Sequence, residues 1–405
     1  MNASFARNAI VLGLLSAVGP FAIDMYLPSL PAISADFQAS DAATQGSLLA
    51  FFAAVAVCQL VYGPVADSFG RKPPLYFGGV LYVIGAVGCS LAPSIGWLIA
   101  ARFLQGVGAC AGMTIPRAIV RDLHRGHEAA RLMSLIMLVF SVSPILAPIT
   151  GSLVTQFGSW REIFWVLSIL GLAALAIAVF VLVETRPPAE RIPFNPPAVA
   201  RNYFELLRDR HFLGVVFIGG FGMSSFFAYL SGSSFMYIDH FGFTPPEFSF
   251  VFSINAIAFI GMAQATGALG KRFGLPRVVN TALTFYLTVI GTLLVLTLFG
   301  VDNPFVVIGF LFVGFGAMGL VVPSTAALAL EEYGATAGTA SALMGTLQLV
   351  LAGIVIGLVG AFGSGGKPLP MIAAMACCAL VAFVLARFTL TTAGTAESAQ
   401  VQPAE

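Results

Sequence analysis

The chain has 405 residues, of which 58% are hydrophobic and only 9% are charged. Soluble domains carry roughly 25% charged residues, so this composition excludes a soluble protein. The formal net charge of +1 provides no basic surface for nucleic acid, and we expect no nucleic-acid partner. A spanning helix needs about 20 apolar residues, so the hydrophobic share is sufficient for about twelve spans across a lipid bilayer.

Apolar runs bounded by charged residues, Pro or Gly predict the membrane-spanning helices. We place them near 8–28, 45–66, 74–92, 96–118, 132–154 and 162–183, and near 211–236, 247–269, 277–299, 303–325, 338–361 and 368–390. The predicted fold is an all-α membrane protein of two pseudo-symmetric six-helix bundles, 1–183 and 211–390. The polar, Pro-rich stretch 184–210 is predicted to be a linker with a surface helix near 199–208, and 391–405 a disordered tail.

Basic residues are distributed unevenly between the two sides of the predicted spans. Only Arg161 and Lys367 fall in loops on one side, whereas Arg117 and nearly all other Lys and Arg fall on the other. The positive-inside rule therefore predicts that both termini and the linker are cytoplasmic. Arg102 is then the one basic residue expected inside the membrane.

The two halves share short sequence repeats. GPVADSFGRKP at 63–73 recurs as GALGKRFGLPR at 267–277, and GVGA at 106–109 recurs as GFGA at 314–317. Two halves with the same orientation are the parallel-repeat plan of one class of secondary transporters. In the second copy Gly270 replaces the acid of the first, so any function of that acid is asymmetric.

The loop 63–73 combines small, acidic and basic residues. Gly63 allows close helix approach, Asp67 ends a helix, and Gly70 turns the chain so that Arg71 and Lys72 face the cytoplasm. The loop resembles the signature loop of the major facilitator superfamily. An ordinary positively charged loop is the alternative.

That resemblance implies a latch between the halves. In the family's pattern Asp67 caps the helix that begins near Gly338, and Arg71 pairs with an acid at the inner end of the fourth span, which is Asp122 here.

RFLQGVG at 102–108 resembles the fourth-span motif of twelve-span drug:proton antiporters, which implies that Arg102 acts in proton relay. AIDMYLPSLP at 22–31 resembles the first span of bicyclomycin-resistance (Bcr/CflA-type) exporters and contains Asp24, the only acid well inside a predicted span. At 1.5 Å per residue, both residues lie roughly 6–9 Å below the outer ends of their helices and could share one cavity for proton coupling. Two alternatives stay open: Arg102 extends outward to water, or Asp24 faces the outer solvent.

SPILAPITGS at 143–152 resembles the fifth-span motif of proton antiporters. Pro144, Pro148 and Gly151 match the pattern, while Ala147 and Ser152 stand where the family has Gly. A small-residue face for helix contact is still expected.

Polar side chains in the middle of spans are candidates for the substrate cavity: Tyr26, Gln59, Gln105, Tyr229, Asn255, Gln264 and Gln348. For the amides, a helix-to-helix hydrogen bond is the alternative. Ser224 and Ser225 are expected to bond their own backbone. The five Cys residues show no metal-ligand spacing, and no Ser, His and acid set is placed for catalysis, so we expect no metal, no cofactor besides the proton gradient and no enzyme activity.

Together these features predict a proton-coupled multidrug efflux antiporter of the bacterial inner membrane, working as a monomer by alternating access. Its expected partners are small amphiphilic drugs or metabolites, neutral or singly charged, together with protons and the lipid bilayer. One alternative is an exporter of a natural amino acid or sugar derivative. Another is a transporter-like receptor or scaffold, which would tolerate the loss of Asp24.

The charge distribution generates a test of orientation. In a cysteine-free background, a single cysteine at Asp36 should react with an impermeant thiol reagent added outside, and one at Arg125 should not. Reaction in the reverse pattern would overturn the predicted topology.

Overall fold

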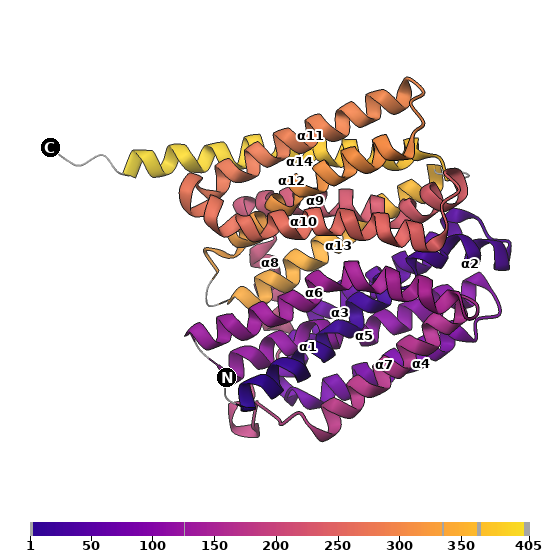
Figure 1. The fold of residues 1–405 in the computed structure, drawn as a ribbon. Coiled ribbons are helices and arrows are strands. Elements are labelled where there is room, and N and C mark those ends of the chain that lie inside the picture. Colours follow the sequence, from indigo (N-terminus) through magenta and orange to yellow (C-terminus); the bar gives the residue numbers. More distant parts are fainter. Residues whose placement is uncertain (1–2, 125, 334–335, 363–365, 401–405) are drawn as a thin grey trace. The chain divides into compact units, whose positions relative to one another are not determined.

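The computed structural model describes residues 3–124, 126–333, 336–362 and 366–400, and every regular element within them is a helix (Figure 1). Twelve helices in this part of the chain are long and apolar enough to cross a membrane, which confirms the twelve predicted spans. In chain order the α-helices of the first half are α1 Ala3–Asp24, α2 Leu30–Phe37, α3 Asp41–Phe69, α4 Lys72–Ser90, α5 Ile95–Leu123, α6 Gly126–Thr155 and α7 Arg161–Phe180.

The second set begins after the linker. Its elements are α8 Pro196–Leu206, α9 Arg210–Ser234, the π-helix η3 Phe235–His240, α10 Pro245–Phe273, α11 Leu275–Leu298, α12 Pro304–Leu330, α13 Ala337–Phe362 and α14 Pro368–Gln400. Helix α8 lies where the sequence predicted a surface helix. The predicted tail 391–405 begins within α14, and residues 401–405 lie outside the described residues.

The first span is longer than predicted and is interrupted. It runs from Phe5 to Phe37 rather than ending near residue 28. Helix α1 ends at Asp24, and the chain continues through the 3-10 turn η1 Leu27–Ser29 into α2. Pro28 has no N–H group to continue the helical ladder, which explains a break at this point but not an end of the span.

The described chain groups into two compact units. Unit 1 holds the residues up to Val199 together with Ser234–Ser253, and unit 2 holds Ala200–Ser233, Ile254–Phe362 and the residues from Lys367 onward. The end segment η3 and the first turns of α10 therefore group with unit 1. The two compact units do not test the predicted division into six-helix bundles at 1–183 and 211–390, which remains a prediction.

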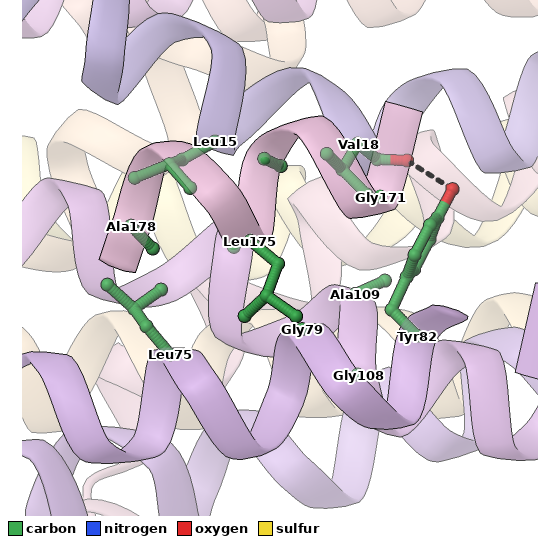
Figure 2. A pocket seen from close by; sticks show the side chains of 12 residues that line it. Leu15, Val18, Leu75, Gly79, Tyr82, Gly108, Ala109, Gly171, Leu175 and Ala178 are labelled. Atoms are coloured by element: carbon green, nitrogen blue, oxygen red, sulfur yellow. Dashed lines mark hydrogen bonds between the residues drawn. The ribbon is translucent and has the colours of Figure 1, made fainter. Parts of the chain in front are cut away.

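Helix α5 is central to unit 1, where it contacts α1, α3 and α4. Small residues allow this packing: a Cβ at Gly106 would lie 2.6 Å from the carbonyl oxygen of Phe51 on α3. Helices α1, α4, α5 and α7 leave only a small cavity of about 30 Å³ between them (Figure 2). Its lining is apolar except for Tyr82, whose hydroxyl donates to the Val18 carbonyl at 3.4 Å, so it is a packing space and not a site for a polar substrate.

In unit 2, α11 packs against α12 and α14. The Tyr286 hydroxyl of α11 lies 2.5 Å from the Ser225 hydroxyl of α9, and Ser225 also donates to the Met375 carbonyl of α14 at 3.3 Å. Ser225 thus joins α9 to α11 and α14. It does not make the predicted hydrogen bond to its own backbone. Ser224 does bond its own helix, at the Gly220 carbonyl.

The linker is anchored at both ends by carboxylates that cap helices. Glu184 accepts hydrogen bonds from the backbone N–H groups of Arg71 (2.9 Å) and Lys72 (3.1 Å) at the start of α4. In return the Lys72 ammonium group donates to the Leu182 carbonyl at 2.7 Å, just beyond the end of α7. At the other end, Asp209 accepts from the backbone N–H groups of His211 and Phe212 in the first turn of α9. An anion at a helix start and a cation at a helix end both interact favourably with the helix dipole.

The cap formed by Glu184 generates a stability prediction. Burial favours the neutral acid, but bonds from the backbone of Arg71, Lys72, Arg186 and Thr185 outweigh burial and lower the pKa of Glu184 below its ordinary 4.5. A group with a lowered pKa contributes stability above that ordinary value and loses it as the pH falls through its folded pKa. Glu184→Gln should therefore cost about 1–3 kcal/mol at pH 7 and progressively less as the pH falls below 4.5, measured by thermal or denaturant unfolding.

Glu190→Gln is the matched control, because Glu190 is an exposed acid of the same linker. Equal effects of the two substitutions at pH 7, or a Glu184→Gln effect that persists in acid, would contradict the role of the cap.

Candidate functional site

Asp24 lies at the break in the first span and not at its outer end. It is the last residue of α1, and 5% of its surface is exposed. Because the span continues to Phe37, Asp24 lies thirteen residues before the end of the span, deeper than the 6–9 Å expected from the sequence. The hydroxyl of Ser143, on α6, lies beside its carboxyl group. The alternative in which Asp24 faces outer water is therefore wrong.

Arg102 is fully enclosed, with 0% of its surface exposed. Its guanidinium carbon lies 4.4 Å from the ring centre of Tyr26 and 4.4 Å from that of Phe51, with Phe164 at 5.8 Å. Aromatic faces attract a cation, and they do so more strongly when water is excluded. Arg102 does not extend to outer water, so that alternative is also wrong.

The hydrogen bonds of Arg102 connect it to the break in the first span. Its Nη1 donates to the Ala22 carbonyl at 3.0 Å and to Gln105 Oε1 at 2.6 Å, while Nε and Nη2 make no hydrogen bond. In a continuous helix the Ala22 carbonyl would accept from the N–H of Tyr26. Here the helix has already ended at Asp24, and the carbonyl accepts from Arg102 instead.

Asp24 and Arg102 are thus brought to the same region of unit 1 without forming an ion pair. Arg102 bonds a carbonyl two residues before Asp24, and no nitrogen of Arg102 lies within 4.0 Å of the Asp24 carboxylate among the described contacts. Asp24 is deeper than expected, while Arg102 lies near the start of α5. The two residues still come together because the long side chain of Arg102 reaches α1. The carboxyl group is therefore not held by the guanidinium.

A second cluster surrounds the loop between α3 and α4. Arg71 donates to Asp122 at 2.7 Å and 3.1 Å through two nitrogens and to Asp67 at 2.8 Å. The pairing of Arg71 with Asp122 is the one that the family resemblance implies. Arg186, at the start of the linker, also donates to Asp67 at 3.0 Å, and Thr185 donates to Asp122 at 3.0 Å.

The loop differs from the expectation in three details. Arg71 does not face the cytoplasm, since its side chain is only 3% exposed. Burial opposes its charge, but Asp122 and Asp67 outweigh burial and raise its pKa. Lys72 is also turned back onto the chain, at the Leu182 carbonyl. Gly63 has no neighbouring atom within 4 Å of a built Cβ, so it is not at a close helix contact. Gly70 has a φ of 95°, a turn conformation that favours glycine.

The motif on α6 packs against the break in the first span. A Cβ at Gly151 would overlap the carbonyl oxygen of Met25, so glycine is required for this approach. Pro144 and Pro148 lie inside the same helix. Two carbonyls of the motif accept hydrogen bonds from α10 within unit 1: Ser249 donates to Pro148 at 2.9 Å and Ser253 to Ile145 at 2.9 Å.

The candidate cavity residues occupy different surroundings. In unit 1, Tyr26 and Gln105 are part of the Arg102 site, and the Nε2 of Gln59 is buried without a hydrogen bond. In unit 2, the Asn255 amide donates to the Tyr229 hydroxyl at 2.9 Å, which is the helix-to-helix bond kept open as an alternative. Gln264 is exposed, and Gln348 is half-buried beside Gly219.

Sequence reasoning missed Glu184, Ser249 and Ser253, whose partners lie about 100 residues away in the chain and leave no local pattern. It also assigned Arg117 to an inner boundary. The structure places Arg117 within α5, six residues before its end, with the guanidinium carbon 5.1 Å from the ring centre of Phe140 on α6.

Several solved structures share this fold. A bacterial homologue of the human lysosomal transporter Spinster, in an inward-facing conformation, covers 100% of both chains with a TM-score of 0.76 at 15% identity. A D-xylose–proton symporter covers 95% of this chain and 97% of its own, with a TM-score of 0.72 at 16% identity. At these identities the similarity shows the fold alone.

Sequence relatives are more similar. The uncharacterized MFS-type transporter YdgK of Bacillus subtilis is 39% identical over 87% of this chain and 88% of its own. A bicyclomycin resistance protein homolog of Haemophilus influenzae is 33% identical over 95% and 96%, and the multidrug resistance protein MdtL of Escherichia coli is 31% identical over 91% and 92%. The family model of the Major Facilitator Superfamily matches residues 12–357. The chain is a multi-pass membrane transporter rather than an enzyme, and it belongs to the Major Facilitator Superfamily.

Proposed function

We propose that the protein exports small amphiphilic drugs from the bacterial cytoplasm in exchange for protons. The observation that carries this proposal is the buried Asp24 carboxyl at the break in the first span, close to but not paired with the enclosed Arg102. An ionisable group inside a membrane span is costly, and transporters use such groups to carry protons. The names of relatives linked to bicyclomycin and multidrug resistance support the substrate class.

In the proposed mechanism Asp24 takes a proton from outside and releases it inside. The charge of Arg102 is balanced by aromatic faces, a carbonyl and an amide, so Asp24 can change its protonation without breaking an ion pair. Coupling requires that proton and drug each bind the two conformations with different affinity. Alternating access of the two halves of the chain then moves each ligand across the membrane.

The inner cluster is proposed to stabilise one conformation of the transporter. Arg71 holds Asp67 and Asp122 together, so the loop between α3 and α4 is tied to the end of α5. The Arg186 bond to Asp67 ties the linker to the same loop. A change of conformation at this end of the spans must break or rearrange these ion pairs. That Asp67 caps the helix near Gly338, as the family resemblance implies, is part of the same proposal.

The proposed substrates are neutral or singly charged. One carboxylate balances one proton or one positive charge, and a second buried charge without a partner costs several kcal/mol. The positive charge of Arg102 adds to the penalty for a cation. Bicyclomycin and chloramphenicol, which are uncharged, are therefore suitable probes, and methyl viologen is a suitable dication for comparison.

Asp24→Asn tests proton coupling. The variant should lose uphill export of chloramphenicol driven by a pH gradient in proteoliposomes, because Asn cannot carry the proton. The neutral drug should still bind the variant, since it carries no formal charge that pairs with Asp24. Drug flux and equilibrium binding are measured on the same preparation.

Asp36→Asn is the matched control, because Asp36 is an exposed acid on the same span that pairs with Arg161. Uphill export that persists in Asp24→Asn, or wild-type export of methyl viologen as efficient as that of chloramphenicol, would remove Asp24 from the centre of the mechanism.

Asp67→Asn and Arg71→Ala test the inner cluster. Turnover should fall by about tenfold or more, because removing one member of a partly buried ion pair leaves the other charge unpaired. The drug Kd should stay within about threefold of the wild-type value. Lys271→Ala, in the last turn of α10 within the second copy of the repeat, is the control for loss of a basic residue. Lost affinity with normal turnover per bound drug would contradict a role in conformational change.

A further inference from the structure

Helix α5 carries a second arginine within the span Ile95–Leu123. The guanidinium carbon of Arg117 lies 5.1 Å from the ring centre of Phe140 on α6, so cation and ring are in contact range. The Nε atom is buried and makes no hydrogen bond. Both residues lie in unit 1, so the arrangement is internal to one compact unit.

Other basic residues of unit 1 have partners of a different kind. Arg71 is paired with Asp67 and Asp122, and Arg186 with Asp67. Arg102 donates to a carbonyl and an amide. Among the described residues, no acid lies within 4.0 Å of Arg117, and its guanidinium donates no hydrogen bond. A charge inside a span needs a partner, and the described residues supply Arg117 with the ring of Phe140 but with no acid.

The geometry of Arg117 leaves one mode of binding available. Arg117 is partly exposed as a whole residue, and among the described residues its two terminal nitrogens make no hydrogen bond, whereas Nε is enclosed. The planar fork of a guanidinium matches the two oxygens of a carboxylate or phosphate. Phe140 is in contact range of the guanidinium through its ring, which offers these donors no carboxylate or carbonyl acceptor.

We propose that Arg117 and Phe140 form a subsite that binds an acidic group, such as a carboxylate, of the exported compound. The inference rests on the proposed export function and specifies which singly charged substrates it favours: compounds that combine an aromatic or apolar body with one negative charge. Phe140 lies one helical turn from Ser143, which is beside Asp24. The acid-binding subsite and the proposed proton site therefore adjoin along one helix, α6.

The subsite has a consequence for energy coupling. Export of a monoanion in exchange for one proton moves a net two positive charges inward, so both the membrane potential and the pH gradient drive it. Export of a neutral compound in exchange for one proton moves only one positive charge inward, so the membrane potential contributes half as much. An anion-binding residue thus favours the substrates that the proton gradient can concentrate most.

The test compares an acid with its uncharged ester on the purified full-length protein in an uncharged detergent. The probes are 2-naphthoate and methyl 2-naphthoate, which share the aromatic body, and Kd is measured by calorimetry. The wild type should bind the acid at least about tenfold more tightly than the ester. Arg117→Gln should bring the two affinities to within about twofold by weakening only the acid. Arg117→Lys, which keeps the charge but loses the fork, should retain part of the preference.

Arg121→Gln is the matched control, because Arg121 is an exposed arginine one turn further along α5. It should keep the wild-type preference. Unchanged binding of the ester shows that each variant is folded. Equal wild-type affinity for both probes, binding of neither probe, or a preference that survives in Arg117→Gln would overturn the proposal.

A second arm separates a substrate from a lipid headgroup as the source of the anion. Titration with phosphatidylglycerol that shows Arg117-dependent binding while 2-naphthoate shows none would overturn the assignment to the substrate. Because these are binding measurements without a gradient, the acid preference can hold even if Asp24→Asn keeps uphill export. Failure of this proposal and failure of the proposed antiport are therefore distinguishable.

Discussion

The enclosed charge of Arg102 is the constraint on which the architecture of unit 1 depends. A guanidinium removed from water needs acceptors and favourable electrostatics. The protein supplies aromatic faces from the first span, α3 and α7, and a carbonyl at Ala22 that the interrupted first span leaves outside its own ladder. The same interruption places Asp24 at a helix end inside the span, and Gly151 on α6 allows α6 to pack against it. The break in the first span, the buried Arg102 and the carboxyl group of Asp24 thus depend on one another.

The linker takes part in the folded structure at both ends rather than joining two halves passively. Glu184 caps α4 beside the loop that holds Asp67 and Arg71, and Asp209 caps α9 and accepts a hydrogen bond from Tyr333. Each carboxylate is stabilised by backbone N–H groups at a helix start, where the helix dipole favours a negative charge. A rearrangement at the start of α4 or of α9 must therefore involve the adjoining end of the linker.

Much of this structure could be predicted from the sequence because apolar length, charge bias and short motifs are local signals. The twelve spans and the Arg71 pairing with Asp122 are present as expected. The extension of the first span past Pro28 could not be predicted, because a proline gives the same signal at a helix end and at a break within a span. Arg117 was assigned to a boundary because the charge rule counts residues without showing where their side chains point. The bonds of Ser249 and Ser253 to α6 depend on tertiary packing, which a single sequence does not reveal.

The central claim is that the carboxyl of Asp24, free of Arg102, exchanges a proton when drug binds. Its most direct test is the number of protons released per bound bicyclomycin, measured in weakly buffered detergent solution with a pH-sensitive dye. The account predicts about one proton per bound drug for the wild type and for Asp36→Asn, and none for Asp24→Asn at equal drug occupancy. Full proton release by Asp24→Asn, or drug binding without proton release by the wild type, would contradict it.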